Sequence, residues 1–143
     1  MKRIEILLAL LLAAGSAQAA TLQTDADIRG FADRVMAKVA EGDLPGAFAV
    51  MKPYTIIPPT EFDAAALQSK SQRDLVGTRF GATIGYEFIA EKRSGQSLLK
   101  LTYIEKAERH ALPWIFYFYK TPSGWVLNSF FWNDRMPDLL AGQ

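Results

Sequence analysis

Glu105 is the acidic residue whose setting best suits proton transfer. In an alternating strand it shares a face with Tyr103, and the predicted pairing places Tyr86 opposite Tyr103. A carboxyl group in an apolar pocket holds its proton more tightly and can serve as a general acid or base. Glu105 with Tyr86 or Tyr103 is therefore the candidate catalytic group. The competing interpretation is a solvated glutamate beside Lys106 at the end of a strand.

His110 is the only histidine, and the chain has no cysteine. A zinc site draws on several such ligands, so none is predicted. A Ser/His/Asp triad needs a presented serine, and the sequence has no Gly-x-Ser-x-Gly elbow. Glycine patterns that bind phosphates or dinucleotides are also missing. We therefore expect His110 on an exposed loop, and we predict no cofactor and no metal.

Large aromatic residues are concentrated in the last third of the chain. Their simplest interpretation is a core, because aromatic side chains bury large areas. Several also have a polar group and are candidates for lining a pocket for an apolar or planar ligand. Arg73, Arg79 and Lys100 are candidates for a positive contact to such a ligand, and the simplest interpretation of all three is solvated surface charge. The candidate ligand-binding residues are Tyr86, Tyr103, Trp114, Tyr117, Trp132 and Arg79.

The first half of the mature chain has helical signals. Thr24 is placed to cap a helix whose apolar residues recur at helical spacing, and Gly42 is a natural stop. Asp43 caps a short second helix, which Pro53 ends.

A third helix follows an extended segment at residues 56–59, since a residue before proline avoids helical geometry. A capping box at Thr60 predicts its start, and it is expected to run to about Arg73.

From Gly85 the hydrophobic period becomes two, which predicts strands at residues 86–92, 98–106, 113–120 and 125–133. A two-residue turn at Ser94-Gly95 pairs Arg93 with Gln96. One face of this hairpin is then apolar, with Tyr86, Phe88, Ala90, Leu99, Leu101 and Tyr103. The other has Glu87, Ile89, Glu91, Leu98, Lys100 and Thr102.

The second hairpin is predicted to turn at residues 122–124 as a type I turn with a bulge, pairing Thr121 with Trp125. Its core face is expected to contain Trp114, Phe116, Phe118, Val126, Asn128, Phe130 and Trp132. The opposite face has Ile115, Tyr117, Tyr119, Leu127, Ser129 and Phe131. Both faces are apolar, so the helices can cover only one. An uncovered apolar face of this kind marks a ligand groove or an interface.

Residues 1–19 are predicted to be a signal peptide that is cleaved near Ala19. Lys2 and Arg3 precede an unbroken apolar run at residues 6–14, which is shorter than the about 20 residues of a spanning helix. Removing Lys2 and Arg3 from 16 basic residues and Glu5 from 15 acidic ones leaves fourteen of each. We therefore predict one periplasmic or secreted domain at residues 20–143, with no membrane span and no basic surface for nucleic acid.

Three helices followed by a four-stranded sheet resemble the nuclear transport factor two-like (cystatin-like) superfamily, and in particular its small exported members of unknown function. The similar segments are residues 40–48 (AEGDLPGAF), 73–77 (RDLVG) with Gly81, 114–120 (WIFYFYK) and 124–127 (GWVL). The resemblance implies an α+β fold in which N-terminal helices pack on a curved antiparallel sheet, a cone-like roll. It also implies a pocket and frequent dimers, and it leaves the activity open.

The leading functional hypothesis is an exported, non-catalytic binding domain with an apolar aromatic pocket. In this hypothesis the domain forms a homodimer through the second hairpin's spare face and takes an apolar small molecule. One alternative is a small isomerase-like or dehydratase-like enzyme, which requires a carboxylate within hydrogen-bond reach of a tyrosine. Another is an envelope accessory factor that binds a protein partner.

Overall fold

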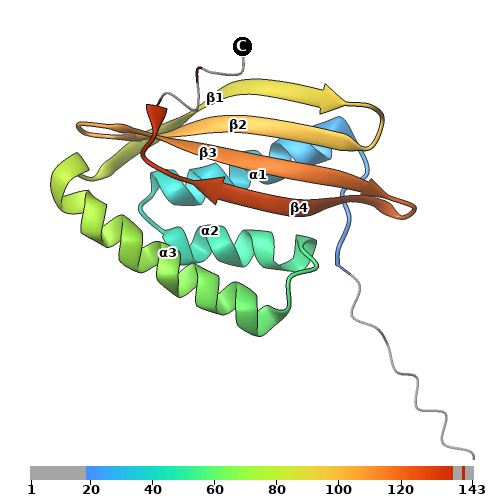
Figure 1. Ribbon diagram of the computed structural model, residues 1–143, viewed down its shortest axis with the longest axis horizontal. Helices are drawn as coiled ribbons and strands as arrows, with labels where there is room; N and C mark the ends of the chain where they lie inside the picture. Colours follow the sequence, from blue (N-terminus) through green and yellow to red (C-terminus); the bar gives the residue numbers. More distant parts are fainter. Residues whose placement is uncertain (1–18, 137–139, 141–143) are drawn as a thin grey trace, which may run out of the picture.

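The computed structural model describes residues 19–136 and residue 140. It is a two-layer α+β domain, with three helices on one face of a four-stranded antiparallel sheet of order β1-β2-β3-β4 (Figure 1). The elements are α1 (Asp25–Ala40), α2 (Leu44–Met51), the 3-10 turn η1 (Lys52–Tyr54), α3 (Pro59–Phe80), β1 (Thr83–Ser94), β2 (Leu98–Ala107), β3 (Ala111–Thr121) and β4 (Gly124–Trp132). The predicted fold class is confirmed.

The first two helices begin where their capping residues predict. The Thr24 hydroxyl accepts from the backbone N–H of Asp27, whose carboxylate accepts in return from the backbone N–H of Thr24. At α2 the Asp43 carboxylate accepts from the backbone N–H of Gly46 at 2.9 Å. These bonds satisfy donors that a helix start leaves without partners.

Helix α3 differs from its prediction at both ends. It starts at Pro59, where the missing N–H costs nothing in the first turn, and no side chain caps it, so the predicted capping box at Thr60 is wrong. It continues past Arg73 to Phe80, which is buried. Gly81 then reverses the chain with a φ of 84°, a conformation that favours glycine.

The first hairpin has a different register from the predicted one. Its loop is three residues long, so Ser94 pairs with Leu98 and Arg93 with Leu99, and the predicted pairing of Arg93 with Gln96 is wrong. A β-bulge between Phe88 and Ala90 then adds one residue to β1. The bulge reverses the faces of the following residues. Ala90 leaves the predicted core face, and Glu91 and Arg93 move onto the helix side.

The second hairpin matches its predicted register only away from the turn. Trp114 pairs with Trp132 and Ile115 with Phe131, as the prediction requires. Nearer the turn a bulge in β4 shifts the pairing, so Thr121 faces Gly124 instead of Trp125. As a result Leu127 lies in the core and Val126 on the opposite face, the reverse of the prediction, and the bulge lies at Asn128.

The core lies between the helices and the inner face of the sheet. Its fully buried members come from α1, α2, the start of α3 and three strands, and include Phe31, Met36, Met51, Phe62, Leu101, Tyr103, Trp114, Phe116 and Phe118. Segments outside the strands close the β4 edge through bridges from Leu22 to Trp125 and from Thr55 to Leu127.

Residues 1–18 of the predicted signal peptide lie outside the described residues. In the described part of the chain no helix is both long and apolar enough to cross a membrane.

Candidate binding surface

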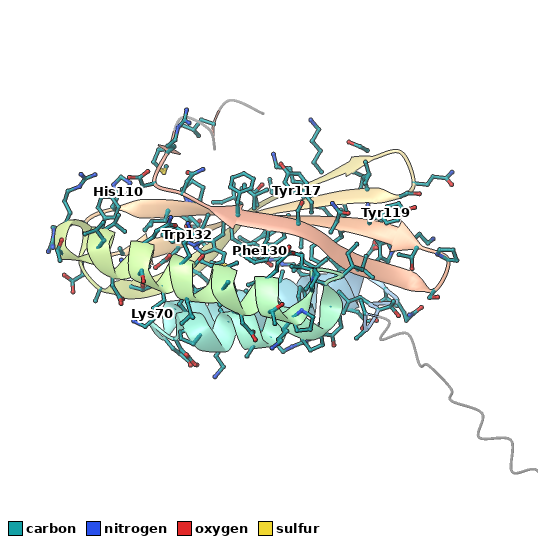
Figure 2. The ribbon with its side chains drawn as sticks, turned by 60° about the horizontal axis from the view of Figure 1, so that its bottom comes forward. Lys70, His110, Tyr117, Tyr119, Phe130 and Trp132 are labelled. Carbon is teal, nitrogen blue, oxygen red and sulfur yellow. The ribbon has the colours of Figure 1, made fainter. Side chains whose placement is uncertain are left out.

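The predicted ligand-binding residues do not line one cavity. Tyr103 and Trp114 are fully buried in the core. Trp132 stacks on Trp114 with ring centroids 6.2 Å apart, and half-buried Tyr86 lies 6.1 Å from the Tyr103 ring. Tyr117 lies on the opposite face of the sheet: in Figure 2 it points away from the helices, whereas Trp132 points toward α3. The sheet therefore divides the predicted group between its two faces.

Arg79 and His110 lie at the end of the molecule where α3 meets β1. Arg79 is exposed; its guanidinium lies 4.9 Å from the Phe80 ring centroid and 4.0 Å from the Asp134 carboxylate. His110 precedes β3 in a loop, as predicted, but it is half-buried instead of exposed. Its ring stacks on Phe80 at 4.0 Å, and its Nε2 lies 3.1 Å from the Asp134 carbonyl oxygen.

Glu105 is buried, with 2% of its side chain exposed, so the expected solvated glutamate is wrong. Arg73 of α3 donates from Nε to its Oε1 at 2.8 Å, and the Thr83 hydroxyl donates to the same oxygen. Trp114 donates from Nε1 to Oε2 at 3.1 Å. Both carboxylate oxygens therefore have partners. The ion pair joins α3 to β2, and the hydrogen bonds from Thr83 and Trp114 add β1 and β3.

A second carboxylate accepts from a buried tyrosine. The Tyr103 hydroxyl donates to Asp33 Oδ1 at 2.7 Å, and Arg29 Nε approaches the same oxygen at 3.3 Å. The Arg29 guanidinium lies 3.4 Å from the Phe88 ring centroid, a cation–π contact. The contact expected of the enzyme alternative thus occurs at Asp33 instead of Glu105. It attaches α1 to the sheet.

Burial raises the pKa of Tyr103 well above its usual value of 10, and its hydrogen bond to Asp33 adds to the shift. The unfolded chain releases this proton above about pH 10 while the folded chain keeps it, so stability falls as pH rises there. We expect a loss of at most about 1.4 kcal/mol per pH unit from this group. Tyr103→Phe is expected to cost about 1.5 kcal/mol at pH 7, because a hydrogen bond to a charged group is lost.

Urea unfolding at pH 7 to 11 measures both effects. Tyr103→Phe is expected to flatten the alkaline slope relative to the parent protein, because the variant has no buried phenol that keeps its proton. A slope equal to that of the parent protein contradicts the assignment.

The outer face of the sheet is the surface that α1, α2 and α3 leave uncovered (Figure 1). Directly paired residues share a face, so the register arranges this surface in rows across the four strands. Three successive rows are Ser94–Leu98–Tyr119–Val126, then Lys92–Lys100–Tyr117–Ser129, then Ala90–Thr102–Ile115–Phe131. A row that contains two lysines therefore lies between two largely apolar rows.

The half of this face on β3 and β4 forms an aromatic patch, defined here as Ile115, Tyr117, Tyr119, Val126 and Phe131. Tyr119 and Phe131 are each 44% exposed, whereas Ile115 and Val126 are buried. The Tyr117 and Phe131 rings lie 6.3 Å apart. In Figure 2 Tyr117 and Tyr119 lie on the far side of the sheet from α3, whereas Phe130 and Trp132 lie toward it. The patch has no charged side chain.

Beside the patch is a groove of about 500 Å³, named here the lysine groove. Its walls come from all four strands and include Lys92, Ser94, Leu98, Lys100, Tyr117, Asn128 and Ser129. A volume of this size fits a small organic molecule. Of the three basic residues considered as ligand contacts, Arg73, Arg79 and Lys100, it is Lys100 that lines a cavity on this face.

Another cavity, of about 490 Å³, lies between α2 and α3 and is lined in part by Phe48, Phe62 and Leu67. The lysines at its rim are already paired, Lys52 with Asp63 at 2.8 Å and Lys70 with Asp74 at 2.6 Å. In residues 19–136 no group of three or more histidine and acidic side chains is arranged to hold a metal ion.

Sequence reasoning missed Lys92, Asp33 and the partners of Glu105. The first was hidden by the bulge in β1. Asp33 and Arg73 come from helices, and helical spacing alone does not indicate which strand residue a helix side chain meets. Thr83 and Trp114 come from the neighbouring strands, and the sequence alone did not fix the pairing of β2 with β3.

Comparison with known proteins adds no assignment. No family model matches the chain, and neither a curated protein nor a solved structure is similar to it.

Proposed function

We propose that this protein is an exported, non-catalytic binding domain that forms a homodimer through the aromatic patch. We place it as a small member of the nuclear transport factor two-like superfamily. The observation that carries the proposal is the pair of aromatic side chains, Tyr119 and Phe131, that stand 44% exposed on a sheet face without a covering helix. Export is supported by the positive start and apolar run within residues 1–19.

A second copy fits the patch because the patch is uncharged. In a twofold dimer each residue of the interface meets the same surface of the other copy, so a charged patch repels itself. Here the contacting groups are two tyrosines, a phenylalanine and aliphatic side chains. Aromatic residues are enriched at interfaces, while lysine and acidic residues are depleted there. The lysine groove shares Tyr117 with this patch, but its two lysines lie on β1 and β2, outside the patch.

Light scattering on the protein purified after expression of the full chain tests the dimer. We expect a dimer at micromolar concentrations and a monomer for Tyr119→Lys/Phe131→Lys, because each copy then brings two ammonium groups to the same interface. Leu67→Lys/Leu75→Lys is the matched control: both leucines are highly exposed on α3, on the other side of the molecule, and this variant is expected to stay dimeric.

Far-UV circular dichroism of each variant checks that the fold is retained. A parent protein that is monomeric throughout the micromolar range overturns the dimer, as does a lysine-substituted patch that still dimerises.

A further inference from the structure

We propose that the lysine groove binds a small organic anion with an apolar body, such as an aromatic or alkyl carboxylate or sulfonate. The inference rests on the proposed function in taking the outer face as the binding surface, and it names the ligand class. It does not depend on whether the aromatic patch also forms a dimer.

The first argument is the unbalanced charge of the groove. Lys92 and Lys100 are directly paired across β1 and β2, and like charges in this position repel each other. Within residues 19–136 neither ammonium group has a carboxylate partner. Glu91 is adjacent to Lys92 in sequence, but the bulge turns it to the inner face. There the Arg93 guanidinium forms ion pairs with Glu91 at 3.4 Å and with Asp25 at 2.8 Å.

The acidic residue on the same face of β1 is Glu87, which pairs with Ile104. The row of Ala90 and Thr102 separates it from the lysines. An anion between the two ammonium groups replaces their repulsion with two attractions.

The second argument is the chemistry of the remaining walls. Leu98 is 50% exposed at one end of the groove and Tyr117 forms a side, so the body of a ligand has an aliphatic and an aromatic surface to contact. Ser94, Asn128 and Ser129 offer hydrogen-bonding groups at the rim. The two lysines by themselves would attract inorganic phosphate as well as an organic anion. The apolar walls, however, favour an anion that also has a hydrophobic part.

The test compares two fluorescent probes that share one ring system. 1-Anilinonaphthalene-8-sulfonate carries a negative charge, and N-phenyl-1-naphthylamine is the same molecule without the sulfonate. We expect saturable binding of one sulfonate probe per chain, about tenfold tighter than binding of the neutral probe and weakened by salt. Lys92→Gln/Lys100→Gln is expected to abolish this preference while leaving the neutral probe's affinity unchanged.

Lys52→Gln/Lys70→Gln is the matched control, because it removes two lysines from the cavity on the helix side. It is expected to keep the full preference for the sulfonate probe. Decanoate should displace the sulfonate probe from the parent protein, whereas inorganic phosphate at the same concentration should not.

Three results overturn the groove proposal: equal affinity for the two probes, a preference that survives Lys92→Gln/Lys100→Gln, or displacement by phosphate as effective as by decanoate.

Light scattering on the same samples separates this proposal from the dimer. A monomer that keeps the lysine-dependent preference rejects the dimer alone, and a dimer without the preference rejects the groove alone.

Discussion

Arg73→Met is expected to destabilise the protein by about 3–5 kcal/mol, because it leaves the Glu105 carboxylate buried without its counter-charge. Methionine keeps most of the arginine stem, so the loss reports mainly the charge. Thr83 and Trp114 still donate to Glu105, but neither supplies a positive charge. Urea unfolding monitored by tryptophan fluorescence measures the free energy of unfolding.

Two further variants separate charge from packing. Arg79→Met removes an exposed arginine from the same helix and is expected to change stability by less than about 0.5 kcal/mol. Arg73→Met/Glu105→Gln removes the buried charge, while the oxygen of the new side-chain amide can still accept from Trp114. The double variant should therefore be more stable than Arg73→Met alone. If it is less stable, the proposed cause is wrong.

Phe31→Ala is the second substitution with a large expected effect, a loss of about 3–5 kcal/mol through a cavity between α1 and the sheet. Phe31 is fully buried, with its ring centroid 4.8 Å from that of Tyr54 and 5.9 Å from that of Phe118 in an edge-on contact. The truncation removes contacts to both the η1 turn and β3. These surroundings belong to a continuous core and can collapse only in part.

Leu75→Ala is the control, since Leu75 is 75% exposed on α3 and its loss is expected to stay within about 0.5 kcal/mol. Both variants are measured by urea unfolding, where an unchanged slope shows that the denatured state is comparable. A cost below about 1 kcal/mol for Phe31→Ala contradicts the idea that this ring holds α1 on the sheet.

Local chemistry was enough to predict the helices and the class of fold. Thr24 and Asp43 cap their helices with bonds to residues three positions away, so the evidence lies within one turn of sequence. The alternation of large apolar residues likewise identified four strands and the core position of Trp114 and Phe116. Both signals are short-range.

The polar contacts of the interior required the tertiary structure. Glu105 is 32 residues from Arg73 and Tyr103 is 70 residues from Asp33, and no spacing rule links a strand position to a particular helix residue. The sequence placed Glu105 and Tyr103 on one face correctly. It did not show that the Glu105 carboxylate is buried, or that the Tyr103 hydroxyl donates to the carboxylate of Asp33 and not to that of Glu105.

Residue patterns were sufficient for the starts of α1 and α2, the antiparallel sheet and a surplus of apolar side chains on β3 and β4. The folded chain was needed to show which charges share a face. The bulge between Phe88 and Ala90 adds one residue to β1, and side chains alternate along a strand, so every later residue changes sides. Glu91 and Arg93 turn to α1, and Lys92 turns outward beside Lys100. A hairpin predicted to mix charges thus presents two lysines together, while Arg93 on the inner side forms an ion pair with Asp25 of α1, a residue far away in sequence.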